Sequence, residues 1–274
     1  MTVTRSAPLL SCVMLALSVT PLRAQLTVSQ LELPITSSAT GRVMTSFLVR
    51  NAGKLPAQAT ITREDWDRAE NGENRFAPSG SKGTSCGALV NVFPMSLRIE
   101  PGATEPVRVA VESAQSLSKE CWDIIFIEEQ QQKSALAQSS LQYILRTGVK
   151  VYVAPPGLGR NASITGMTVE KADRRRVTEA SRRTVSAATH RIDVMFSNVG
   201  QLHLTAKGRV EIRRLDNSLA TTIPVAEFPT LPGAVRRLEL EVPASMASGN
   251  YVALALIDFG GAEIAAGQLE LTIP

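Results

Sequence analysis

The chain has 274 residues, with 29 Lys or Arg, 25 Asp or Glu and a formal net charge of +4 at pH 7. Its arginine clusters are scattered and are not interleaved with the aromatic residues on which bases stack, so we expect no nucleic acid partner. The length is sufficient for two domains of ordinary size.

Residues 1–24 have the layout of a secretory signal peptide. Arg5 supplies the positive start, residues 9–17 form the apolar run, and the segment ends in the small residue Ala24. We therefore expect cleavage after Ala24, which removes two arginines and lowers the net charge to +2. A lipoprotein signal ending at Cys12 is the alternative, but almost no apolar run precedes that cysteine. The rest of the chain has no apolar run long enough to cross a membrane.

Short alternating runs separated by turn residues dominate the next part of the chain, residues 25–154. Such runs are typical of half-buried β-strands. The candidate strands are 26–34, 43–51, 57–66, 90–100, 106–113, 123–129 and 141–153. Seven short strands with turn signals at this spacing predict a β-sandwich of the immunoglobulin type.

The alternation breaks at residues 154–161, where paired prolines and two glycines cannot continue a strand ladder. A second set of candidate strands follows: 162–171, 189–198, 208–216, 221–228, 235–243, 250–259 and 263–273. The sequence thus predicts an all-β fold of two immunoglobulin-like β-sandwich domains in tandem, at residues 25–154 and 155–274. The basic stretch 171–183 fits a loop or a short helix.

Each half contains a Pro-Gly turn ahead of an alternating strand, at Pro101-Gly102 and at Pro232-Gly233. This echo is expected if the two sandwiches are related. Ordinary turn chemistry, in which proline precedes glycine, explains it equally well.

Two cysteines follow the leader, Cys86 and Cys121. An even number of cysteines in an exported chain favours a disulfide, and 34 residues between them would give a stabilisation of about 3–4 kcal/mol on the chain-entropy model. A cysteine nucleophile would need a histidine base. The two histidines, His190 and His203, fall in the second predicted domain, which argues against a nucleophile.

Side chains that could carry catalysis or bind a metal are few. The histidines and cysteines have no ligand spacing, and the sequence has no nucleophile elbow or phosphate-binding loop. Asp258 with Glu263, and Glu128 with Glu129, are better explained as solvated surface than as catalytic pairs. We therefore expect no enzyme activity, no metal and no cofactor.

Residues 141–153 carry an unusual double pattern. Leu141, Tyr143 and Leu145 share one face, which three valines continue, while Ile144 and Lys150 lie on the other. Periodicity alone favours an ordinary final strand. An exposed apolar edge that pairs with another chain by strand addition is the alternative, with Ile144 covering the protein's own core.

This strand resembles the last strand of the first domain in the periplasmic chaperones of the chaperone–usher pilus pathway. The resemblance implies two immunoglobulin-like domains in a boomerang arrangement. It also implies that Leu141, Tyr143 and Leu145 are donated to a pilus subunit and that Lys150 binds the subunit's C-terminal carboxylate. Three further stretches are similar to the family: 97–111, 120–129 and 256–261.

The sequence departs from that family at two places. The first strand has Gln30 and Glu32 where the family places a second cationic anchor, and Ala154 stands where the family has an arginine. The resemblance assigns Asp258 to an inter-domain contact, and these departures leave Asp258 and Glu120 without an arginine partner.

The resemblance implies a periplasmic chaperone of a Gram-negative cell that stabilises pilus or fimbrial subunits and delivers them to an outer-membrane usher. The alternative is a structural or adhesive immunoglobulin-like module without chaperone activity, at the surface or in the periplasm. A hydrolase is the least supported of the functions considered.

Overall fold

The computed structural model describes residues 25–38, 41–114, 116–130, 144–171 and 190–274. Among the described residues the secondary structure is β throughout, apart from a single 3₁₀ turn. This confirms the all-β prediction. The predicted leader, residues 1–24, and most of the basic stretch lie outside the described residues, as do Leu141 and Tyr143.

The described residues of the first half form ten strands and the 3₁₀ turn. These are β1 (Leu26–Val28), β2 (Glu32–Thr36), β3 (Val43–Asn51), β4 (Ala57–Arg68), β5 (Asn74–Pro78), η1 (Gly87–Leu89), β6 (Val90–Phe93), β7 (Ser96–Ile99), β8 (Thr104–Val111), β9 (Cys121–Gln130) and β10 (Leu145–Ala154). One sheet has the order β1-β3-β8-β6, and the other has the order β2-β10-β9-β4-β5 with β7 also paired to β4.

The two sheets of the first half enclose one apolar core. Alternate residues of each strand point into it, as the period of two requires. Phe47, Val49, Ile61, Val109 and Ile125 are among its members, and none is more than 1% exposed.

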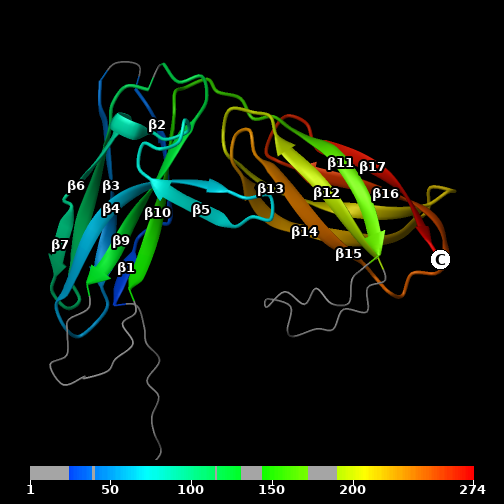
Figure 1. Ribbon diagram of the computed structural model, residues 1–274, viewed down its shortest axis with the longest axis horizontal. Helices are drawn as coiled ribbons and strands as arrows, with labels where there is room; N and C mark the ends of the chain where they lie inside the picture. Colours follow the sequence, from blue (N-terminus) through cyan, green and yellow to red (C-terminus); the bar gives the residue numbers. More distant parts are fainter. Residues whose placement is uncertain (1–24, 39–40, 115, 131–143, 172–189) are drawn as a thin grey trace, which may run out of the picture.

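Where the structure describes the second half, at residues 155–171 and 190–274, it contains seven strands. These are β11 (Ala162–Lys171), β12 (His190–Asn198), β13 (Leu204–Arg214), β14 (Leu219–Thr230), β15 (Val235–Val242), β16 (Gly249–Asp258) and β17 (Ala265–Ile273). One sheet has the order β11-β12-β15 and the other β14-β13-β16-β17. A second core, separate from the first, lies between them. Figure 1 shows the two halves at an angle to each other, connected at one end.

Two stretches predicted as single strands each divide into two strands of opposite sheets. Residues 26–34 contain β1 and the start of β2, and residues 90–100 contain β6 and β7. The second division occurs at Pro94, which has no N–H to donate to a ladder. A strand that changes sheets in this way closes the side of a sandwich.

Asn51 occupies a buried position at the end of β3. Its side-chain amide donates to the carbonyls of Leu55 at 2.8 Å and Ile99 at 2.9 Å, and its side-chain oxygen accepts from the N–H of Gly53 at 2.8 Å. Its own carbonyl accepts from Gly102 at 2.9 Å. One asparagine therefore connects two turns of the first half.

Asn198 makes the same set of contacts in the second half. Its amide donates to Leu202 at 2.9 Å and Thr230 at 3.2 Å, and its side-chain oxygen accepts from Gly200 at 3.0 Å. Its carbonyl accepts from Gly233 at 2.9 Å. The echo of the two Pro-Gly turns in the sequence thus corresponds to a repeated three-dimensional motif.

Candidate functional site

Strand β10 is only partly covered on one of its two edges. It pairs antiparallel with β9 from Leu145 to Val153 and parallel with β2 from Lys150 to Ala154. Within the described part of the chain, its edge opposite β9 therefore has no strand partner from Leu145 to Val149. Unpaired backbone groups along such an edge are a template for another strand.

One face of β10 passes from the core of the first half to the surface. Val149, Val151 and Val153 are completely buried, whereas Leu145 on the same face is 45% exposed. Ile144 is 69% exposed and lies on the opposite face, so the expectation that it covers the protein's own core is wrong. The alternation places it away from the buried valines.

Arg146 covers part of the other face of β10. Its guanidinium lies 3.8 Å from the centre of the Phe126 ring, and its Nε lies 3.4 Å from Glu128 Oε2. It also forms an ion pair with Glu64. These contacts hold the described end of β10 against β9 and β4, so its uncovered edge is supported by the rest of the sheet.

Lys150 lies further along the strand, on the face opposite the buried valines. Its Nζ is 3.3 Å from Oε1 of Glu32, its parallel neighbour on β2, and 5.2 Å from the centre of the Trp66 ring. Its side chain is 20% exposed. The ammonium group therefore lies over the Trp66 ring next to Glu32, and part of the Lys150 side chain reaches solvent.

A second cation reaches the same ring from β4. The guanidinium carbon of Arg68 is 5.5 Å from the centre of the Trp66 ring, and its Nη1 donates to the carbonyl of Gly72 at 3.0 Å. Burial lowers the pKa of the Arg68 guanidinium, while the neighbouring Tyr152 and Glu32 act in the opposite direction. Arg68 was not among the site residues predicted from the sequence, because nothing local to β4 indicates its proximity to β10.

The two halves meet at Glu120, a buried carboxylate just before β9. Its Oε2 accepts from the N–H of His203 at 2.7 Å, and the His203 imidazole stacks on Tyr152 with ring centres 3.9 Å apart. Glu120 therefore has a histidine as its partner across the interface, where the family resemblance implies an arginine. Asp258 accepts from the N–H of Gly260 in its own turn at 2.9 Å, and its inter-domain role stays a prediction.

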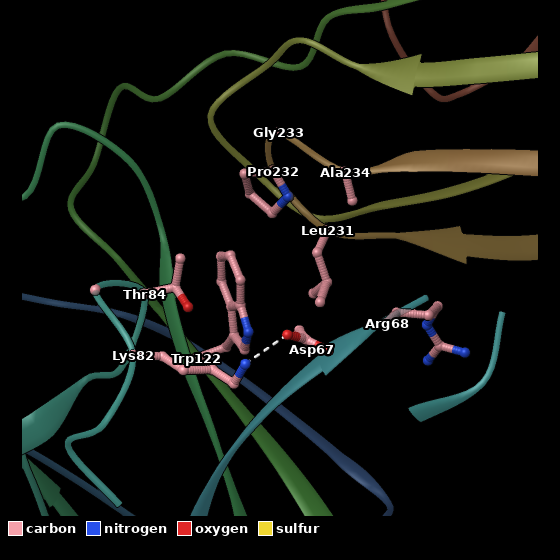
Figure 2. Close-up of a pocket in the computed structure, with 10 residues that line it drawn as sticks. Asp67, Arg68, Lys82, Thr84, Trp122, Leu231, Pro232, Gly233 and Ala234 are labelled. Atoms are coloured by element: carbon pink, nitrogen blue, oxygen red, sulfur yellow. Dashed lines mark hydrogen bonds and ion pairs between the residues drawn. The ribbon is translucent and has the colours of Figure 1, made fainter. Parts of the chain in front are cut away.

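A second contact between the halves involves the hairpin between β4 and β5. The carbonyl of Glu70 accepts from Arg236 Nη1 at 2.7 Å and from the N–H of Arg237 at 2.9 Å. Beside this hairpin lies a cavity of about 360 Å³ between the halves. Figure 2 shows Leu231 of the second half beside Trp122 of the first, and both line this cavity.

The predicted disulfide between Cys86 and Cys121 is present, with the Cα atoms 5.0 Å apart. It joins the segment before η1 to the start of β9. The neighbouring Asp123 accepts from the N–H of Cys86 at 3.1 Å. The disulfide thus fixes the start of β9, next to the contact that Glu120 makes with the second half.

The described residues contain no helix that is long and apolar enough to cross a membrane. They also contain no group of three or more His, Cys, Asp or Glu side chains arranged to hold a metal ion.

No protein-family model matches the sequence, and no curated protein is similar to it. Solved structures are similar in fold. A chain of the chaperone–tip adhesin complex of CFA/I fimbriae biogenesis has a TM-score of 0.50 and 10% identity, covering 92% of this chain and 100% of that one. The class 5 fimbriae chaperone CfaA has a TM-score of 0.49 and 11% identity over 91% of this chain and 99% of its own.

A chain of the CsuC–CsuE chaperone–tip adhesion subunit complex from Acinetobacter baumannii has a TM-score of 0.47 and 12% identity, covering 89% of this chain and 98% of that one. At these identities it is the fold that is shared. The chain has the tandem immunoglobulin-like fold found in fimbrial chaperones.

Proposed function

We propose that the protein is a periplasmic chaperone that binds pilus or fimbrial subunits by donating the strand 141–147 and by binding the subunit's terminal carboxylate at Lys150. The observation that carries this proposal is the edge of β10: among the described residues, no strand pairs with it from Leu145 to Val149, and β2 covers it only from Lys150 onward.

An open edge of this kind suits strand addition. Main-chain hydrogen bonds to an added strand supply affinity, and alternate side chains supply specificity. Leu145 presents an apolar side chain on the face that continues the core, and Leu141 and Tyr143 extend that face in the sequence. A subunit that lacks one strand of its own sandwich would bury this face and complete its sheet.

Lys150 sits five residues beyond Leu145, which is about 17 Å along an extended strand. An added strand that pairs parallel with the open part of β10 must end near Lys150, because β2 already occupies the next part of the edge. The terminal carboxylate of such a strand would lie beside the ammonium group and form a charge-assisted hydrogen bond.

The remaining parts of the proposal follow from the same function. Residues 25–154 form the subunit-binding domain and residues 155–274 the second domain. An outer-membrane usher receives the subunit, and the signal-like leader directs the chain to the periplasm. The protein is not an enzyme and needs no cofactor.

The experiment is co-purification of the tagged protein from periplasmic extracts, with the bound exported proteins identified by mass spectrometry. We expect a fimbrial subunit whose recovery falls at least tenfold in Leu145→Glu and Lys150→Ala. Leu215→Glu, at a 74% exposed turn of the second half, and Lys54→Ala are matched controls and should retain the subunit.

Unchanged recovery of the subunit in both site variants would overturn the mechanism. A stable assembly that stays at the cell surface, with no subunit released, would instead support a structural or adhesive immunoglobulin-like module.

A further inference from the structure

The Trp66 ring is a fixed surface that two cations contact, Lys150 and Arg68. The side chain is completely buried, and its Nε1 donates to the carbonyl of Asp123 at 3.2 Å. Its own carbonyl accepts from Trp122 Nε1 at 2.8 Å, and Tyr152 packs edge-on against the ring with centres 6.1 Å apart. The charged groups of Lys150 and Arg68 therefore pack against a ring whose position is fixed.

Lys150 and Arg68 both contact this ring, although they come from β10 and β4. Their charged groups lie 5.2 Å and 5.5 Å from the ring centre, within the range of a cation–π interaction. A carboxylate placed close to both cations is attracted by each of them. The arrangement therefore favours an anion.

Arg68 has donor capacity left over. Nη1 donates to the Gly72 carbonyl, but its Nε is buried and, among the described residues, has no hydrogen-bond partner. A buried donor without a partner costs free energy, which a ligand oxygen or a rearrangement that reaches it would recover. A guanidinium also matches the geometry of a carboxylate better than an ammonium does.

Glu32 places one of the protein's own carboxylates beside Lys150. Parallel pairing of β2 and β10 puts it directly beside Lys150, with Oε1 3.3 Å from Nζ. Its negative charge also acts on Arg68. Its side chain is 48% exposed, so it is free to turn out into solvent.

We propose that Arg68 is the second cation of the carboxylate site, and that Glu32 is an internal carboxylate that occupies this site until the terminal carboxylate of a client displaces it. This inference rests on the proposed chaperone function and adds to it the residues that set carboxylate affinity. Glu32 then weakens client binding for two reasons. The client's carboxylate must break the ion pair between Glu32 and Lys150, and the negative charge of Glu32 repels it.

The inference makes opposite predictions for two single substitutions. Glu32→Gln keeps the shape of the side chain but removes the competing charge, so a carboxylate should bind about three- to tenfold more tightly. Arg68→Gln removes one of the two cations, so a carboxylate should bind at least fivefold more weakly. Neither substitution should alter binding of a ligand whose end is uncharged.

The probe is a fluorescent decapeptide of alternating valine and threonine with a free C-terminal carboxylate, compared with the same peptide ending in an amide. Fluorescence polarisation gives the dissociation constant of each for the wild-type protein, Glu32→Gln, Arg68→Gln and Lys150→Ala. Glu105→Gln and Arg50→Gln are exposed controls on the other sheet of the first half and should bind like the wild type.

The outcomes separate the two proposals. If the wild type prefers the carboxylate through Lys150, while Glu32→Gln and Arg68→Gln both match the wild type, the present inference is overturned and the chaperone proposal stands. If the wild type binds neither peptide or does not distinguish them, the carboxylate mechanism itself fails, and this inference with it.

Folding of the variants is checked by thermal unfolding. If Arg68→Gln proves unstable, Arg68→Lys, which retains the charge, replaces it. We expect its affinity for the carboxylate peptide to lie between those of the wild type and Arg68→Gln, because lysine lacks the planar donors of arginine. Glu32 is on the surface, so Glu32→Gln tests the competing carboxylate in a protein of near wild-type stability.

Discussion

Glu120 and His203, which are 83 positions apart in the sequence, form a hydrogen-bonded contact between the two halves of the molecule. The Glu120 carboxylate is 4% exposed, accepts from the backbone N–H of His203 at 2.7 Å, and lies 2.9 Å from the imidazole Nδ1. The backbone contact does not depend on which tautomer the imidazole adopts. A buried carboxylate with two donors constrains how the halves sit together.

We expect Glu120→Ala to loosen this arrangement and to lower the free energy of unfolding by about 2–4 kcal/mol, because it leaves buried donors without an acceptor. Chemical unfolding measures the change in stability, and small-angle scattering measures the wider range of inter-domain angles. Glu100→Ala, at an exposed ion pair with Arg98, is the control and should cost less than about 1 kcal/mol. Equal effects of the two substitutions would contradict this role of Glu120.

How much of the fold the sequence predicts depends on what alternation can report. The two-residue period of apolar side chains identified strands such as 43–51, which matches β3. Alternation does not report which sheet a strand joins, so the runs 26–34 and 90–100 were each predicted as one strand although their two ends pair in opposite sheets.

The candidate site shows the same limit. The role of Lys150 was predicted from the resemblance of its strand to the last strand of the first domain in pilus chaperones. Arg68 and the pairing of Glu120 with His203 were not, because each depends on segments that approach one another only after both sandwiches form and pack. A lone arginine at the end of β4 gives no local signal of its neighbours on β10.

The second prediction concerns the repeated asparagine motif. Asn51 and Asn198 are completely buried, and the amide and side-chain oxygen of each make three hydrogen bonds to backbone groups. We expect Asn51→Ala and Asn198→Ala each to cost about 2–4 kcal/mol, since buried backbone groups lose their partners. Denaturant unfolding measures these costs.

The position of each asparagine also predicts which half of the molecule its substitution destabilises. Because the two halves have separate cores, Asn51→Ala should act first on the unfolding of the first half and Asn198→Ala on that of the second. Hydrogen exchange of the backbone amides distinguishes the two. Asn91→Ala, at an exposed position of β6, is the control, and a comparable loss there would argue against the motif.

The third prediction concerns the disulfide. Cys86 and Cys121 are both buried, and their bond closes a loop with a sequence separation of 35. We expect the double variant Cys86→Ser, Cys121→Ser to lose about 2–5 kcal/mol of stability. Reducing agent should destabilise the wild type by a similar amount and leave the double variant unchanged. A response of the double variant to reducing agent would show that another process is involved.

The fourth prediction concerns pH. Asp65 on β4 is 1% exposed and accepts from the N–H of Lys82 at 2.8 Å and of Gly80 at 3.0 Å. Burial by itself raises the pKa of the Asp65 carboxyl, but hydrogen bonds from Ser85, Gly80, Lys82 and Ser81 together outweigh it and lower the pKa below its usual value. The carboxylate therefore holds the segment that follows β5.

A carboxyl whose pKa is lower in the folded than in the unfolded protein stabilises the fold at pH values above the unfolded pKa of about 3.9. That stabilisation is lost as the pH falls through the lower, folded pKa. Asp65→Asn should therefore cost about 1–3 kcal/mol at pH 7, and the difference from the wild type should shrink steadily below about pH 4. Denaturant unfolding at a series of pH values measures this convergence.

Asp216→Asn, in an exposed turn of the second half, is the control and should have a smaller effect on stability at pH 7. A difference for Asp65→Asn that stays constant down to pH 2.5 would show that the ionised carboxylate is not what stabilises this segment.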